Sequence, residues 1–119
     1  MNAARVVLVT APPRAARRLA RALVERRVAA CVNLLPGVRS VYRWKGRVEE
    51  AGETLLVIKT AARRVPALLA AVRELHPGEV PEAVALPVTA GLGPYLRWVD
   101  AETSPRPQGS SAAAVTRPR

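Results

Sequence analysis

The feature that most constrains the fold is a long β-rich region in the middle of the chain. Residues 28–44, VAACVNLLPGVRSVYRW, are rich in β-branched residues and partly alternating, and residues 47–60, RVEEAGETLLVIKT, continue this character after Lys45-Gly46. Gly46 can supply the positive φ of a tight turn, so the two regions predict one long hairpin. We expect Pro36-Gly37 to bend its first strand and Ala51-Gly52 to make its second strand irregular.

The segments on either side of the hairpin predict a βαββαβ order followed by a terminal helix. They are a strand at 5–10, an amphipathic helix at 14–27, a second amphipathic helix at 65–75, a strand at 83–88 and a short helix with Pro94 near its first position. This order predicts an α+β fold, a ferredoxin-like sandwich over residues 1–103, with two helices on one face of an antiparallel sheet. Residues 104–119 are rich in Pro, Ser, Gly and Ala, which predicts a disordered tail.

Such a fold leaves one sheet face without helices and a hairpin that projects beyond the body. Both features favour association with another copy of the chain. The chain has only four aromatic residues, and two of them, Tyr42 and Trp44, lie two apart on one predicted strand and so share a face. We expect this pair to anchor the hairpin at an interface, because large aromatic side chains supply contact area that small ones cannot.

Composition limits the location and the partners of the chain. A single cysteine cannot form an internal disulfide, and the apolar run at 6–9 is too short for the apolar region of a signal peptide, so we expect a cytoplasmic protein. No apolar run approaches 20 residues, which predicts no membrane span. The net charge of +10 is compatible with nucleic acid binding. However, the aromatic RNA-binding motif of this fold class is absent, and the arginines at 14, 17, 18 and 21 form the polar stripe of a helix. Nucleic acid is therefore the minor alternative.

Cys31 and His76 are the only soft or borderline metal ligands in the sequence. A closed zinc site takes four such donors, so a site would need a second chain, or Glu82, Glu79 or water. A Cys and His pair favours copper among divalent ions, so Cu²⁺ is the expected metal, and it is not required for folding. The alternative interpretation makes Cys31 a buried core thiol and His76 a helix C-cap whose ring meets the last carbonyls.

Enzyme activity is not expected from these residues. A nucleophilic cysteine needs a lowered pKa and exposure, which an apolar strand start does not offer. The sequence also shows no Ser-His-Asp order, phosphate loop or pair of carboxylates with clear geometry.

Four linked motifs carry a resemblance to a known family: VAACVNLLPGVRSVYRWKGRVEE, ETLLVIKT, HPGEVPEAVALPV and YLRWV. In order and spacing, over about residues 5–102, they closely resemble the CutA family of divalent-cation tolerance proteins. The resemblance implies a tight homotrimer with hairpins that reach neighbouring subunits, similar to the trimeric PII signalling proteins. The family is tied to tolerance of copper and other divalent metals in bacteria and to anchoring of a cholinesterase in animals.

The resemblance also implies a cleft between subunits near five residues of this chain: Lys45, Lys59, Glu82, Tyr95 and Trp98. A cleft of this kind would take a divalent metal or a small anionic ligand. From the residues alone, Lys59 could instead form a salt bridge with Glu82 or Glu53, and Tyr95 and Trp98 could simply pack together.

Two positions depart from the family pattern. Gly78 stands where the family usually has tyrosine, and Val9 stands where some members have a cysteine. The sequence thus predicts a non-enzymatic trimer that binds divalent metal in metal homeostasis, with a PII-like small-molecule signalling adaptor as the alternative.

Overall fold

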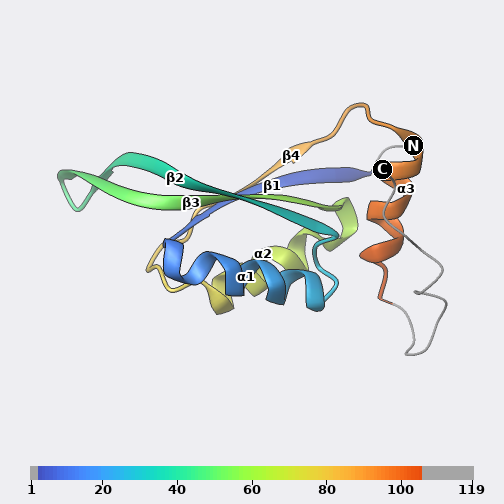
Figure 1. The fold of residues 1–119 in the computed structure, drawn as a ribbon, viewed down its shortest axis with the longest axis horizontal. Coiled ribbons are helices and arrows are strands. Elements are labelled where there is room, and N and C mark those ends of the chain that lie inside the picture. Colours follow the sequence, from blue (N-terminus) through green and yellow to red (C-terminus); the bar gives the residue numbers. More distant parts are fainter. Residues whose placement is uncertain (1–2, 106–119) are drawn as a thin grey trace.

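The computed structural model describes residues 3–105. Within them, the elements in chain order are β1 (Ala4–Ala11), α1 (Pro13–Glu25), β2 (Cys31–Trp44), β3 (Arg47–Ala61), the 3-10 turn η1 (Ala62–Arg64), α2 (Val65–Leu75), β4 (Ala83–Pro87) and α3 (Gly93–Glu102). The strands form one antiparallel sheet in the order β2-β3-β1-β4, with α1 and α2 on one face and α3 at one end (Figure 1). This confirms the predicted α+β order. From position 106 onward, the predicted tail lies outside the described residues.

The core lies between the sheet and the helices α1 and α2. Alternate residues of β1 and β3 point toward the helices, and Val7, Val9, Leu56 and Ile58 are completely buried there. From α1 and α2, the buried stripe consists of Ala15, Ala16, Leu19, Ala20, Leu23, Leu68, Ala71 and Val72. Full burial of one large aliphatic side chain contributes about 1.5–3 kcal/mol, so this layer stabilises the body of the molecule.

The first helix ends earlier than the sequence predicts. α1 ends at Glu25 rather than at position 27, because Arg27 has a left-handed φ of 61°. The Arg27 side chain donates to the carbonyl oxygen of Glu102 at 2.8 Å and lies 3.7 Å from the Glu102 carboxylate. These contacts tie the turn after α1 to the end of α3. The following residues, Val28–Ala30, are buried in a loop, so β2 starts at Cys31.

The sheet face opposite the helices, here called the open face, is largely apolar. Its residues lie between the buried ones along each strand, and in register they are Val6, Leu8, Leu35, Leu55, Val57, Val84 and Leu86. Leu35, Val84 and Leu86 are each about half exposed, at 45%, 50% and 46%. No helix among residues 3–105 covers this face (Figure 1).

Residues 38–53 form a projecting segment of the β2–β3 hairpin, here called the arm. β1 pairs with β3 only up to Thr54, so residues 47–53 pair only with β2 in the described part of the chain. At roughly 3.4 Å per residue the arm extends about 24 Å. It makes the molecule elongated, with extents of 50 × 30 × 24 Å, as Figure 1 shows.

The bend of the hairpin lies at the base of the arm, on β2 alone. The register shifts between Leu35 and Val38, where Pro36 and Gly37 oppose a single residue of β3, and Gly37 has φ 81°. This is the predicted bulge. The predicted irregularity at Ala51-Gly52 is wrong, because both residues keep regular partners on β2. One extra residue on one strand is enough to bend the pair.

The tip of the arm is a two-residue turn. Trp44 pairs with Arg47, and the two residues between them both have positive φ, 51° for Lys45 and 79° for Gly46. This is the backbone pattern of a type I′ turn, which matches the twist of the strands. The predicted turn at Lys45-Gly46, with a positive φ at Gly46, is therefore confirmed.

Candidate metal and ligand cleft

A hollow among the described residues lies where the arm leaves the body. Its volume is about 640 Å³, within the size range of small-molecule sites. The end of β1, the arm and the loop between α2 and β4 each contribute to its wall. The lining residues are Thr10, Pro12, Ser40, Val41, Tyr42, Trp44, Glu53, His76, Gly78, Glu79, Val80, Pro81 and Glu82. Three regions far apart in the sequence therefore meet at one cleft.

His76 holds the loop side of this cleft to the end of β1. Its Nε2 lies 2.7 Å from the carbonyl oxygen of Thr10, and its Nδ1 accepts a hydrogen bond of 2.8 Å from the N–H of Gly78. An imidazole that accepts at Nδ1 carries its proton at Nε2, so Nε2 donates to Thr10. Both ring nitrogens are engaged within one chain, and a metal ion must replace one of these partners.

The alternative interpretation of His76, a helix C-cap, is right about the backbone and wrong about the side chain. Its backbone is the C-cap of α2, with its N–H bonded to the carbonyl oxygen of Val72 at 2.8 Å. The ring does not meet the last carbonyls of that helix but crosses to β1. Gly78 leaves the space for it, because a Cβ at Gly78 would lie 2.9 Å from Cε1 of His76.

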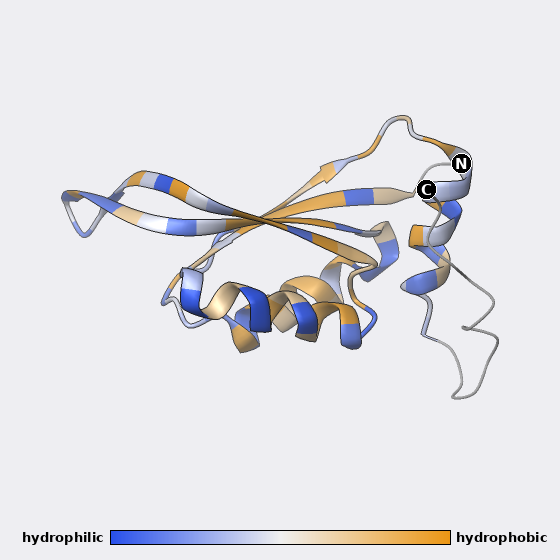
Figure 2. Ribbon diagram, in the orientation of Figure 1, coloured by the Kyte–Doolittle hydropathy of each residue, from blue (hydrophilic) through white to orange (hydrophobic). Residues whose placement is uncertain are grey.

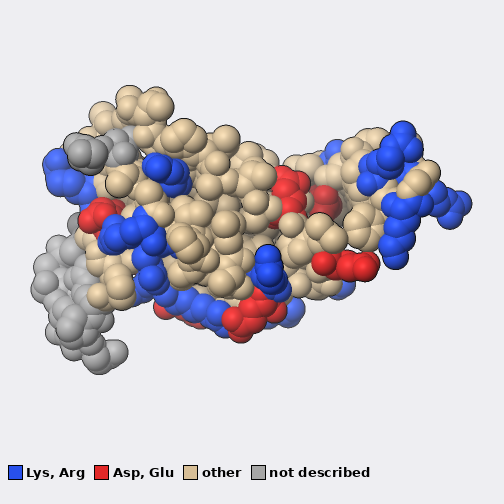
Figure 3. All heavy atoms as spheres, turned by 180° about the vertical axis from the view of Figure 1, so that it is seen from behind, with Lys and Arg blue, Asp and Glu red and all other residues tan. Residues whose placement is uncertain are grey.

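The cleft is acidic although the protein is strongly basic. Glu53, Glu79 and Glu82 line it, and its lining residues include no lysine or arginine. Glu82 accepts a hydrogen bond of 3.2 Å from the Thr10 hydroxyl, so it is fixed beside β1. Figure 3 shows acidic side chains where the arm meets the body and basic ones at the free end of the arm. This arrangement favours a cation in the cleft.

The described residues do not form a complete metal centre in one chain. No three side chains of His, Cys, Asp or Glu among residues 3–105 lie close enough together to hold a metal ion. His76 and Glu82 line the same cleft, but Cys31 is at the other end of the sheet, four residues along β3 from the pair Leu35–Leu55, or about 13 Å. Cys31 and His76 of one chain therefore cannot share an ion.

Cys31 lies on the open face rather than in the core, so the expectation of a buried core thiol is wrong for the single chain. It is half-buried and pairs across β2 and β3 with Lys59. The ammonium of Lys59 donates to the side-chain oxygen of Asn33, 4.0 Å from the Cys31 sulfur. The alternative of a salt bridge from Lys59 to Glu82 or Glu53 is also wrong for the single chain, because Lys59 bonds to the Asn33 amide instead of a carboxylate.

The other residues expected near a ligand lie apart from the cleft within one chain. Lys45 is at the tip of the arm, 5.6 Å from the centre of the Trp44 ring. Tyr95 and Trp98 are on α3 at the far end of the molecule from the arm tip (Figure 1), with ring centres 5.7 Å apart. Only an assembly of several chains can bring these residues to one place.

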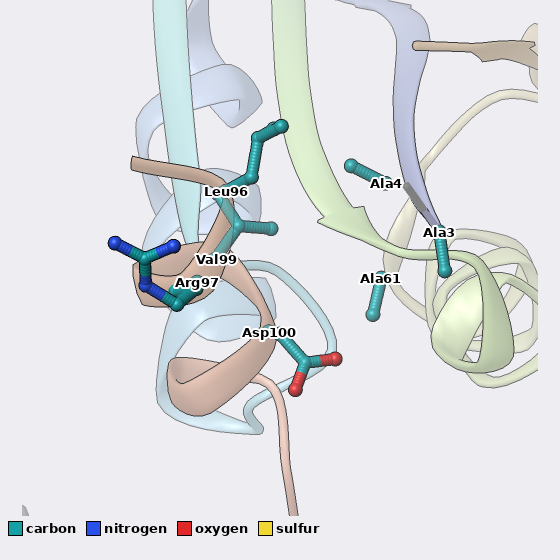
Figure 4. Close-up of a pocket in the computed structure, with 7 residues that line it drawn as sticks. All are labelled: Ala3, Ala4, Ala61, Leu96, Arg97, Val99 and Asp100. Atoms are coloured by element: carbon teal, nitrogen blue, oxygen red, sulfur yellow. The ribbon is translucent and has the colours of Figure 1, made fainter. Parts of the chain in front are cut away.

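A second hollow, of about 470 Å³, lies between α3 and the start of β1 (Figure 4). Ala3, Ala4 and Ala61 form one wall, and Arg97 points away from them. Asp100 is already bonded to Arg63 at 2.6 Å. This hollow therefore offers small apolar side chains and one compensated carboxylate, and it is the weaker candidate for a metal or ligand.

Of the residues that the sequence assigned to a metal or ligand, only His76, Glu79 and Glu82 line this cleft, and sequence reasoning missed the contacts that organise it. The carbonyl of Thr10 and the ring of His76 are 66 positions apart, and no local pattern signals such a contact. The role of Gly78 was visible only as a departure from a family pattern. In the structure it is the residue whose missing side chain makes room for the imidazole.

Comparison with known proteins places the sequence and the fold in one family. The model of the CutA1 divalent ion tolerance protein family matches residues 5–102. The chain is 54% identical over 92 residues to mouse Protein CutA, and the match covers 76% of this chain and 52% of the mouse protein. It is 50% identical over 99 residues to the divalent-cation tolerance protein CutA of Thermus thermophilus, covering 82% and 96%. The chain thus spans about half the length of the vertebrate relatives it matches.

Solved structures agree with the sequence comparison. CutA from Xylella fastidiosa superposes with a TM-score of 0.83 at 41% identity, covering 86% of this chain and 99% of that one. The PII-like protein CutA from Nostoc superposes with a TM-score of 0.80 at 40% identity, covering 84% and 97%. The chain belongs to the CutA1 divalent ion tolerance protein family.

Proposed function

We propose that the protein binds a divalent cation in the acidic cleft at the root of the arm and acts in divalent-metal tolerance. The observation that carries this proposal is that Glu53, Glu79, Glu82 and His76 line one cleft that has no basic lining residue. Carboxylate and imidazole groups are ordinary ligands for divalent transition metals, and Cu²⁺ binds such donors most tightly in the first row. The relative from Thermus thermophilus is named for divalent-cation tolerance, which supports this assignment.

We further propose that the binding unit is a homotrimer. The open face and the arm support it, because an isolated two-stranded hairpin is marginal in water and this one exposes Val41 and Val48 by 62% and 65%. A neighbour packed on these surfaces would bury them and could complete the metal site with its own residues. A metal site shared between chains would also explain why the described residues of one chain do not supply enough ligands.

The expectation of a small anionic ligand fits this cleft less well than a cation. An anion would meet three glutamates and would need a basic group from another copy. The tip of the arm carries Arg43, Lys45 and Arg47, so a neighbouring arm could supply one. A PII-like adaptor of this kind is the second candidate, supported by the cleft volume and by the likeness to the PII-like protein CutA from Nostoc.

Calorimetric titration with Cu²⁺ and Zn²⁺ tests the metal proposal. We expect His76→Ala and Glu82→Gln each to weaken Cu²⁺ binding at least tenfold. The first variant removes the imidazole that would bind the ion and that holds the loop to β1, and the second removes the charge of a carboxylate ligand. Glu25→Gln is the matched control, because Glu25 lies on α1 outside the cleft lining and its side chain bonds to Arg21. Equal Cu²⁺ affinity in the wild type and His76→Ala would remove His76 from the site.

We also propose that the protein acts in the cytoplasm and catalyses no reaction. No helix of residues 3–105 is long and apolar enough to cross a membrane. One relative, from Arabidopsis thaliana, is named as chloroplastic. If the protein acts by binding alone, we expect a chelator to recover the bound metal ion in its original oxidation state, with no chemical product formed.

A further inference from the structure

We propose that the outer face of α1 binds the phosphate backbone of double-stranded nucleic acid without reading its sequence. The surface consists of Arg14, Arg17, Arg18 and Arg21, which are all exposed and line one shallow depression of about 450 Å³ together with Ala22 and Glu25. This surface is here called the arginine stripe. It lies on the helical side of the molecule, opposite the open face, and its first residue, Arg14, follows Pro12 of the acidic cleft by two positions.

The arginine stripe is largely uncompensated within the chain. Arg21 lies 3.3 Å from Glu25, whereas Arg14, Arg17 and Arg18 have no ion pair among the described residues. Four other arginines of this protein form ion pairs with carboxylates outside their own helix or strand; these are Arg26, Arg27, Arg39 and Arg63. The stripe therefore keeps a local charge of about +3 that an external anion can neutralise.

The stripe also works against the helix that carries it. Arg14 and Arg18, and likewise Arg17 and Arg21, are four residues apart on one face, where like charges repel. Arg14 is in the first turn, where the helix dipole disfavours a positive charge and where no acidic residue is present. A bound polyanion would relieve both effects, so its binding is coupled to helix stability.

The chemistry of the stripe favours a rigid array of phosphates. Guanidinium groups bind phosphate with two parallel hydrogen bonds, which an ammonium group cannot do. The stripe spans seven helical steps, about 10 Å at 1.5 Å per residue, and duplex DNA carries one negative charge per about 1.7 Å of its axis. The duplex is already rigid, so binding it costs less ordering entropy than binding a flexible acidic chain.

Two observations disfavour other partners at this surface. The apolar side of α1 is buried against the sheet, so the helix has no apolar face to insert into a lipid surface, as its hydrophilic bands in Figure 2 illustrate. No aromatic residue lines the depression, so single-stranded bases have nothing to stack on. Contacts to a duplex backbone need neither.

Fluorescence anisotropy with a labelled 20-base-pair duplex tests this inference over a salt series from about 50 to 200 mM. We expect the wild type to bind with a slope of log K against log salt near −3, since three to four phosphates are neutralised. In the triple variant Arg14→Gln/Arg17→Gln/Arg18→Gln the affinity should fall at least tenfold and the slope should approach zero. The triple variant should also melt no lower than the wild type, because glutamine is a good helix former and the repulsion is removed.

The matched control is Arg43→Gln/Lys45→Gln/Arg47→Gln, which removes the same three charges from the arm tip. It should keep the affinity and the slope of the wild type. Equal loss in both variants would show that net charge alone attracts the duplex, and absence of binding at 50 mM salt would overturn the inference. Competition by anionic lipid vesicles as strong as by duplex, at equal phosphate, would assign the stripe to a membrane instead. None of these outcomes depends on metal binding in the cleft.

Discussion

At the scale of single residues, the contact between His76 and Gly78 sets the shape of the cleft. The loop after α2 returns so closely to the imidazole that there is no room for a Cβ at position 78. The ring can then accept the N–H of Gly78 while it donates to Thr10. The His76 ring thus fixes the loop that carries Glu79 and Glu82 to the end of β1, together with the hydrogen bond from the Thr10 hydroxyl to Glu82.

Replacing this glycine should therefore disturb the ring. In Gly78→Ala the new Cβ would lie 2.9 Å from Cε1 and 3.1 Å from Nδ1 of His76, so the ring must move and the Gly78 hydrogen bond is lost. We expect a loss of about 1 kcal/mol in the free energy of unfolding, the usual net value of one hydrogen bond. Scanning calorimetry should show a lower melting temperature.

Gly52→Ala is the control for this measurement. Gly52 lies in β3 with regular strand pairing, and an added Cβ would meet no atom closer than 3.7 Å. Its melting temperature should stay close to that of the wild type. If the two alanine variants melted alike, the close contact at His76 would have no energetic importance.

At the scale of elements, the exposed ion pair between Arg26 and Glu74 links the end of α1 to α2. Arg26 donates two hydrogen bonds, of 3.0 and 3.1 Å, to the two carboxylate oxygens of Glu74. These hydrogen bonds and the charge of Arg26 lower the pKa of Glu74 below its ordinary value. The carboxylate form is thus favoured in the folded state.

This shift predicts the sign of a pH effect on stability. Because the pKa of Glu74 is lowered by folding, the stability from the pair is fully present above the ordinary carboxylate pKa and is lost as the pH falls through the lowered value. Glu74→Gln should melt slightly below the wild type at pH 7, and the difference should vanish in strong acid. A difference that grew on acidification would contradict this assignment. The effect should be small, because both side chains are exposed to solvent.

The elements themselves were largely predictable, because they follow local patterns. Alternating apolar residues indicate the strands, and apolar residues at helical spacing indicate the helices. Pro36-Gly37 marks the bulge, because Gly37 has a positive φ, which glycine adopts more readily than other residues. The positive φ of Lys45 was not predictable, because the pairing of Trp44 with Arg47 imposes it. The same holds for the side-chain partners of Lys59 and His76, which depend on which strands become neighbours.

At the scale of the whole molecule, only one face of the sheet is covered by helices in the described part of the single chain. Helices cover one side of the sheet, whereas the open face and the arm keep apolar groups in water. Tyr42 and Trp44 both line the acidic cleft, and their regular pairing with Glu49 and Arg47 puts them on one face of β2, as predicted. Their place at an interface between subunits stays a prediction.

Removing this aromatic pair should weaken the assembly. We expect Tyr42→Ala/Trp44→Ala to shift the species seen by size-exclusion chromatography with light scattering from about three times the 12.8 kDa chain mass toward one. Arg43→Ala is the control, because this residue lies between the two and points to the other side of the strand. A variant that remained trimeric at micromolar concentration would place the interface elsewhere.

The position of β1 in the sheet also determines the order in which the chain can fold. β1 is made first but lies between β3 and β4, so its partners are residues 54–61 and 83–87, far along the sequence. The β2–β3 hairpin needs only local contacts and can close within microseconds, whereas β1 must wait for long-range loop closure. During synthesis the apolar segment 6–9 therefore remains an unpaired strand until its neighbours emerge, and this interval is when the chain is most prone to aggregate.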